Sequence, residues 1–273
     1  MRDITVIIPL LENQLDSDEL KNAVKSVDQC QEYYDGELKI LYVVPTPKEE
    51  RHCNYTMFPT NRPISQKYIE NDTGCYDYCS QINFGVKHVD TEYFSILEYD
   101  DYYTKKWFKM FDDYYVTNED VSVFLPINII HNAKTDEREF VNDIIWSSGF
   151  ANELGIIDFD SLQQSGSFNL TGGVFKTSDW LGYKPSIKVA FNYEYLLRAT
   201  KPDENDNPRQ KIMVVPKEGY HHEIFKDGSL SSYYLDNITD NDNMKWFELA
   251  KREYAFDEDR NKDIINIEEE KMK

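Results

Sequence analysis

The nonapeptide YFSILEYDD, residues 93–101, passes from an apolar run directly into a group of carboxylates. Tyr93 to Leu97 has the length and the residue types of a buried strand. Glu98, Asp100 and Asp101 follow at once, so we expect three acidic side chains at the carboxyl end of that strand. Hard divalent cations such as Mg²⁺ and Mn²⁺ bind carboxylate oxygens, which makes the group a candidate metal site. A solvated acidic turn is the alternative that this stretch alone leaves open.

Strand-like and helix-like segments alternate on both sides of this stretch. The predicted strands cover residues 4–9, 38–44, 67–70, 93–97, 121–125 and 212–215. The predicted helices cover about residues 20–29, 76–89, 107–115 and 193–200. Asp16 and Glu19 are spaced like a capping box before the first helix. The alternation predicts an α/β fold with a mainly parallel open sheet flanked by helices, a Rossmann-like nucleotide-binding architecture. Such sheets bind ligands outside the carboxyl ends of their strands, where the acidic group falls.

Composition narrows the classes of partner. The 273 residues, 40% of them hydrophobic, are enough for one substantial core. A formal net charge of -20 argues against a nucleic acid or an anionic lipid surface as a partner. The longest apolar runs, Ile4 to Leu11 and Leu38 to Val44, fall short of the ~20 residues of a transmembrane segment. The N-terminus lacks the pattern of a secretory leader, so we expect a cytoplasmic protein.

The four cysteines are ordinary usage for a reduced intracellular chain. Cys75 and Cys79 share helical spacing with Ile82 and Val86, and this pattern favours packing in the core over metal or redox chemistry.

Several motifs, taken in order, resemble those of family 2 glycosyltransferases, which adopt the GT-A fold. Val6 to Pro9, followed by Glu12, is similar to the first strand of that family and its following polar residue. Ser80 to Gly85, which contains Asn83, resembles the helix motif Ala-x-x-Asn-x-Gly. Leu97 to Asp101 stands in the place of a Leu-Asp-x-Asp-Asp motif, with Glu98 replacing its first aspartate.

The resemblance continues in the second half of the chain. Gly172 to Lys176 resembles a small-residue loop on the acceptor side. Tyr220 to His222, followed by Gly228 to Ser231, resembles a late aromatic and histidine segment that ends in Gly-Ser-Leu-Ser. The likeness covers roughly residues 3–235. We therefore expect a GT-A domain at 1–235 and a charged helical tail at 236–273.

The resemblance implies a nucleoside-diphosphate sugar as donor and a divalent metal, Mn²⁺ or Mg²⁺, on its diphosphate. The metal ligands that it implies are Asp100, Asp101 and a histidine, His222 or its neighbour His221. The residues that it implies near the donor are Pro9, Glu12, Asn83, Glu98, Lys176 and Arg198. For the histidines a place in a surface turn stays open, and for Lys176 and Arg198 the role of an ordinary surface or helix charge.

Two positions depart from the family pattern. Val44 to Pro47 offers no carboxylate where the family reads the uracil ring, and Glu12 is the nearest substitute. The Glu-Asp pair that supplies the catalytic base aligns with Phe191-Asn192, and the amide of Asn192 cannot accept a proton at neutral pH. Glu194, two residues on, is the remaining candidate base. Its alternative role is an exposed carboxylate in the first turn of a helix.

Two functions are compatible with these motifs. The first is a metal-dependent, inverting glycosyltransferase that moves a sugar to an acceptor hydroxyl on a glycan, lipid or protein. The second is a catalytically degenerate domain of the same fold that serves as a binding or structural component of a protein assembly. The intact acidic group favours the first, and the missing base and uracil carboxylate favour the second.

Overall fold

The computed structural model describes residues 2–46, 55, 57–142, 155–164, 168–185, 187 and 190–224. The predicted tail at 236–273 and the motif Gly228 to Ser231 lie outside these residues, so the domain boundary at residue 235 stays a prediction. None of the helices in the described ranges combines the length and the apolar content that a bilayer span requires.

The strands form one sheet within the described ranges. They are β1 (Ile4–Pro9), β2 (Leu38–Pro45), β3 (Ser65–Asn71), β4 (Tyr93–Ile96), β5 (Tyr102–Tyr103), β6 (Val123–Asn132), β7 (Arg138–Val141), β8 (Ile156–Ile157), β9 (Val174–Lys176) and β10 (Ile212–Ile224). The order is β3-β2-β1-β4-β9-β6-β10-β5, with β7 paired to β6 and β8 paired to β10. The strands β3, β2, β1 and β4 all run parallel, as expected. The other half of the sheet is mixed, because β9 runs antiparallel between β4 and β6.

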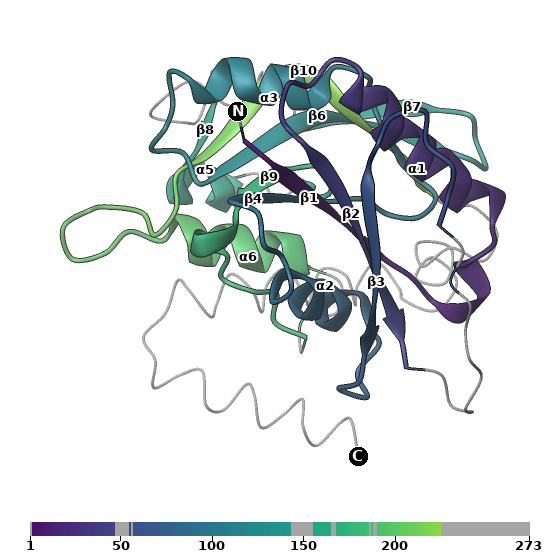
Figure 1. Ribbon diagram of the computed structural model, residues 1–273. Helices are drawn as coiled ribbons and strands as arrows, with labels where there is room; N and C mark the ends of the chain where they lie inside the picture. The colour runs from purple at the N-terminus through teal and green to yellow at the C-terminus, as the bar shows by residue number, and fades with distance from the viewer. Residues whose placement is uncertain are drawn as a thin grey trace.

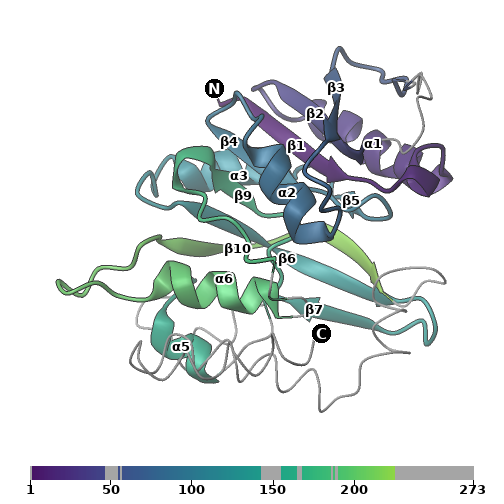
Figure 2. The same cartoon turned by 90° about the horizontal axis from the view of Figure 1, so that it is seen from below.

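Helices cover both faces of the sheet, which confirms the predicted α/β fold (Figures 1 and 2). The helices α1 (Asp18–Gln31) and α3 (Trp107–Tyr115) lie on one face. The helices α2 (Tyr78–Val86), α5 (Phe159–Gln164) and α6 (Phe191–Thr200) lie on the other. Two short 3-10 helices, η1 (Glu12–Gln14) and η3 (Thr177–Asp179), complete the described elements.

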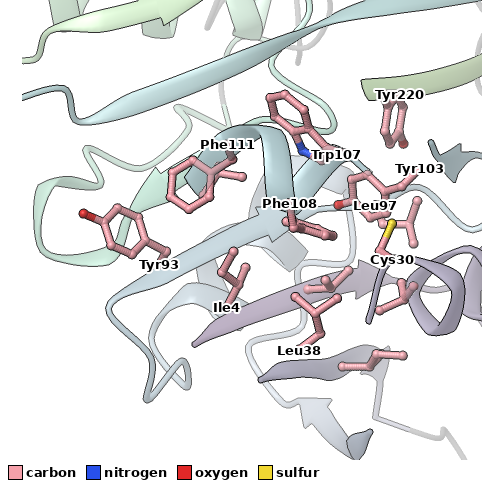
Figure 3. Close-up of a cluster of buried hydrophobic side chains, with 14 of the residues drawn as sticks. Ile4, Cys30, Leu38, Tyr93, Leu97, Tyr103, Trp107, Phe108, Phe111 and Tyr220 are labelled. Carbon is pink, nitrogen blue, oxygen red and sulfur yellow. The ribbon is translucent and has the colours of Figure 1, made fainter. Parts of the chain in front are cut away.

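A buried cluster of apolar side chains lies on each face of the sheet. Strand β1 contributes to both, because Val6 and Ile8 pack in the cluster under α1 and α3 while Ile7 packs in the other. Burial on both faces explains why the run from Ile4 to Pro9 is almost entirely apolar, with Thr5 as its polar member. Figure 3 shows the first cluster, where rings from α3 meet Tyr93, Tyr103 and Tyr220 from the sheet.

Several predicted boundaries are corrected by the structure. Helix α1 is capped by Ser17, whose side chain accepts a hydrogen bond from the Leu20 amide at 3.1 Å, so the Asp16–Glu19 capping box is wrong. The segment Val174 to Lys176 is a strand rather than part of a loop. Strand β10 continues past Val215 through Tyr220 to His222, across two register shifts against β6.

The cysteine prediction is correct for one residue of the pair. Cys79 is buried on α2, but Cys75 is exposed. The reason is that α2 begins at Tyr78, after its N-cap Asp77, so Cys75 lies in the turn before the helix and does not share its apolar face.

Candidate functional site

Two strands bring three polar side chains together at one edge of the sheet. Strand β4 ends at Ile96, and the chain then passes through Glu98 and Asp101 into β5. Strand β10 runs antiparallel to β5, with Tyr220 opposite Tyr103, and so carries His222 back to Asp101. Glu98, Asp101 and His222 each offer a ligand atom, and these atoms lie within 4.8 Å of one another. We call these three residues the Glu98 cluster.

Asp101 is fixed by three hydrogen bonds although it is only 1% exposed. Its Oδ2 accepts a hydrogen bond from the Tyr220 hydroxyl at 2.7 Å and lies 2.7 Å from His222 Nδ1. Its Oδ1 accepts one from the backbone amide of Glu223 at 3.0 Å. Burial alone would lower the pKa of His222, but the charge and hydrogen bond of Asp101 outweigh burial and raise that pKa to about 10. His222 therefore carries its proton at neutral pH and forms an ion pair with Asp101, in which the Asp101 side chain is fully buried and that of His222 is 18% exposed.

Glu98 lies beside this pair, and its surroundings disfavour the ionised form of its carboxyl group. Burial, and then the negative charges of Asp101 and Asp100, raise the pKa of Glu98 to about 7 against the opposing effect of His222. Its Oε1 accepts a hydrogen bond from the Thr171 hydroxyl at 3.3 Å. A divalent cation would neutralise the crowded negative charge here, and two carboxylates with one imidazole are a donor set that suits Mn²⁺ or Mg²⁺.

Tyr220 organises the cluster, although sequence reasoning gave it no role of its own. Its hydroxyl accepts a hydrogen bond from the Glu98 backbone amide at 3.1 Å and donates the one to Asp101. Its ring packs directly on Gly172, where a Cβ atom would lie 2.5 Å from ring carbons. Gly172 also has φ +81°, a conformation that glycine adopts without strain. The sequence signal that could have indicated this contact is the presence of both the Gly172 motif and the Tyr220 segment among the family-like motifs.

Comparisons with known proteins bear on this fold. No family model and no curated protein matches the sequence. The solved structure of S. aureus TarS 1–349 in complex with UDP-GlcNAc matches with a TM-score of 0.63 and 13% identity, covering 96% of this chain and 69% of that one. TarS 1–349 in complex with UDP matches with a TM-score of 0.57 and 12% identity, covering 96% and 68%. TarS is a GT-A-like glycosyltransferase. The chain has a glycosyltransferase fold of the GT-A type.

This likeness concerns the fold. A further TarS 1–349 structure has a TM-score of 0.58 and 14% identity, and the chain covers only 60% of its length. In this GT-A fold the Glu98 cluster occupies the end of β4, where the sequence resemblance placed its acidic motif.

The other donor-side candidates lie at varied places in the GT-A fold. Pro9 is buried at the end of β1, and Glu12 is exposed in η1. Asp100 is close enough to affect the pKa of Glu98 and of His222 but does not belong to the Glu98 cluster. The Asn83 side chain holds the backbone of Tyr183 through two hydrogen bonds, of 2.7 and 2.8 Å. The roles of these residues toward a donor stay predictions.

The structure does not bring the two predicted diphosphate cations, Lys176 and Arg198, to the Glu98 cluster. Lys176 pairs with Tyr93 at the start of β4, and five residues of extended chain, roughly 17 Å, separate that position from Glu98. The Arg198 guanidinium donates hydrogen bonds to the Glu194 carboxylate and to the backbone carbonyls of Leu181 and Gly182. It is a partly buried cation, 13% exposed, that is engaged in four hydrogen bonds rather than an ordinary helix charge.

The two candidates for the acceptor base lie on α6. Glu194 is completely buried, so its predicted alternative as an exposed helix carboxylate is wrong. Its Oε1 lies 2.9 Å from Arg198 Nε and 3.4 Å from Lys184 Nζ. Asn192 accepts a hydrogen bond from the Tyr183 hydroxyl at 3.1 Å and donates one to Asn169 Oδ1 at 3.3 Å.

Proposed function

We propose that this chain is a metal-dependent, inverting glycosyltransferase that moves a sugar from a nucleoside-diphosphate donor to an acceptor hydroxyl. The observation that carries the proposal is the Glu98 cluster, which lies at the carboxyl end of β4 in a GT-A fold. Ligands of α/β sheets bind at such an edge. The match to TarS structures that contain UDP or UDP-GlcNAc supports a nucleotide sugar as the ligand class.

The residues of the Glu98 cluster would together bind the metal on the donor side. Glu98, Asp101 and His222 would hold the divalent cation, which supplies Lewis-acid stabilisation of the leaving diphosphate when bound. Asp101 is already held by Tyr220 and by the Glu223 amide, so it needs little reorganisation to act as a ligand. His222 would hold the cation through a deprotonated ring nitrogen, so that cation binding would release a proton, and with Nε2 as the ligand atom the Nδ1 hydrogen bond to Asp101 would be kept.

The acceptor side supports a second candidate function. A single displacement needs a group that takes the proton of the acceptor hydroxyl. Asn192 carries an amide where the family has its base, and Glu194 is tied to Arg198 in the interior. These observations favour a degenerate GT-A domain that retains donor binding as part of an assembly.

Thermal shift measurements test the donor and metal part of the proposal, with UDP-GlcNAc as the probe and Mn²⁺ either present or replaced by EDTA. A ligand that binds only the native state raises Tm, and we expect the larger rise with Mn²⁺. Glu98→Gln should remove the Mn²⁺-dependent part of the rise. The matched control is Asp113→Asn, which changes an exposed carboxylate on α3. Equal Tm values with and without UDP-GlcNAc and Mn²⁺ would contradict the proposal, and Asp100→Asn tests whether Asp100 also contributes.

Release of UDP from UDP-GlcNAc distinguishes turnover from binding alone. Slow release by the native chain in water supports the transferase. Donor binding without release, together with release by Asn192→Asp, supports the degenerate domain, because the substitution restores a carboxylate at that position.

A further inference from the structure

A chain of hydrogen bonds leads from the Glu98 cluster to the first turn of α6. The Thr171 hydroxyl lies 3.3 Å from Glu98 Oε1 and 2.8 Å from Asn169 Oδ1. The same Asn169 oxygen accepts a hydrogen bond from Asn192 Nδ2 at 3.3 Å. The two ends of this chain, Glu98 and Asn192, are the residues that the proposed function assigns to its donor side and its acceptor side.

Buried asparagine side chains hold the middle of the chain in place. Asn142, which is 1% exposed, donates from Nδ2 to the carbonyls of Pro126 at 3.0 Å and Asn169 at 2.8 Å. Its Oδ1 accepts a hydrogen bond from the Asn169 amide at 3.0 Å. Asn128 donates to the Thr171 carbonyl at 3.0 Å. Buried amides cost free energy unless they are bonded, so these contacts fix the backbone of residues 169–171.

The Asn142 backbone adds a second indication that this support is specific. Its φ is +63°, in the left-handed region that asparagine adopts more readily than most residues other than glycine. In this conformation the Asn142 side chain reaches three backbone groups of two other segments.

The single proton of the Thr171 hydroxyl explains how a change at Glu98 can reach Asn169 through these hydrogen bonds. The Thr171 hydroxyl has one proton, but the Glu98 and Asn169 oxygens both lie within its reach, and the Tyr78 side chain is a further hydrogen-bond partner. While Glu98 is ionised, this proton can go to Glu98 or to Asn169, and not to both at once. A ligand that engages Glu98 alters which oxygen receives this proton, and the altered Asn169 oxygen is the one that holds Asn192.

We propose that Thr171 and Asn169 are positioning residues that couple the Glu98 cluster to the first turn of α6. The proposal rests on the proposed function, because Glu98 and Asn192 gain their roles from it. Binding of a donor then changes how firmly the first turn of α6, which carries Asn192, is held in place. This change precedes the binding of an acceptor.

The first test measures Mn²⁺ binding in the presence of UDP by calorimetry. Thr171→Val removes the hydroxyl while keeping the shape, and we expect about tenfold weaker Mn²⁺ binding because a hydrogen bond to a charged ligand is lost. Thr171→Ser keeps the hydroxyl and should stay within about twofold of the native chain. Thr171→Ala replaces the valine variant if the latter does not melt cooperatively. Equal affinities for the valine and serine variants would overturn the inference.

The second test measures coupling by hydrogen exchange of the peptide that spans residues 190–200. Addition of Mn²⁺ and UDP should slow exchange in the native chain and in Thr171→Ser, but leave it unchanged in Thr171→Val at saturating ligand. A merely structural role of Thr171 would raise exchange with and without ligand alike, and that result overturns the inference. Absence of any Mn²⁺ and UDP binding by the native chain would instead overturn the proposed function on which it rests.

Discussion

Tyr220 shows how much one side chain can contribute to a site without belonging to its ligand set. Its hydroxyl joins the backbone of Glu98 to the carboxylate of Asp101, and its ring occupies the space that the missing side chain of Gly172 leaves. Three segments that lie far apart in the sequence, around Glu98, Gly172 and Tyr220, therefore meet at one ring. The glycine is required for two separate reasons, its positive φ and the proximity of the ring.

These two reasons can be separated by experiment. Gly74 has φ +76°, and among the described residues no atom beyond its two chain neighbours lies within 4 Å of a Cβ position, so Gly74→Ala should cost only the backbone strain, about 1–2 kcal/mol. Gly172→Ala adds the collision with Tyr220 and should cost roughly 2 kcal/mol more. Denaturant unfolding of both variants measures the difference. Equal losses would show that the ring moves aside freely.

At the scale of the element, α6 is secured by an ion pair between successive turns. Glu194 and Arg198 lie four residues apart, and the arginine also holds two carbonyls of the segment before the helix. A carboxylate as deeply buried as Glu194 is stable only when it is paired and hydrogen-bonded. This arrangement ties Glu194 to the interior and leaves Arg198 only 13% exposed.

Glu194→Gln tests whether this carboxylate is structural or catalytic. Because the substitution removes the charge that pairs with the partly buried Arg198, which keeps its bonds to two carbonyls, we expect the free energy of unfolding to fall by roughly 1.5–3 kcal/mol. Replacing Glu194 and Arg198 together by methionine should recover part of that loss. Denaturant unfolding provides the measurement. Native stability combined with a hundredfold loss of sugar transfer would instead establish Glu194 as the base.

At the scale of the whole molecule, one twisted sheet with helices on both faces supplies both buried clusters (Figure 2). The site lies where the parallel half, which ends at β4, meets the mixed half, which carries β10. Glu98 and Asp101 follow β4 of the parallel half, and His222 comes from β10 of the mixed half.

Removal of residues 237–273 tests the domain boundary expected from the sequence. Among the described residues, every member of the two clusters lies at or before Tyr220, so we expect the shortened chain still to unfold cooperatively, with a loss of a few kcal/mol at most. Calorimetric melting of the full and shortened chains provides the comparison. An insoluble or non-cooperative product would place the tail within the core.

The amino-acid sequence is sufficient to predict the α/β class, the positions of β1, β2 and β4, and the carboxylates after β4. These features depend on local periodicity, which neighbouring residues encode. The tertiary structure alone decided that Asp101 pairs with His222, that Lys176 lies far from the cluster and that Glu194 is buried. These outcomes depend on strand register and on which helix face meets the core, and both are set by contacts between distant segments.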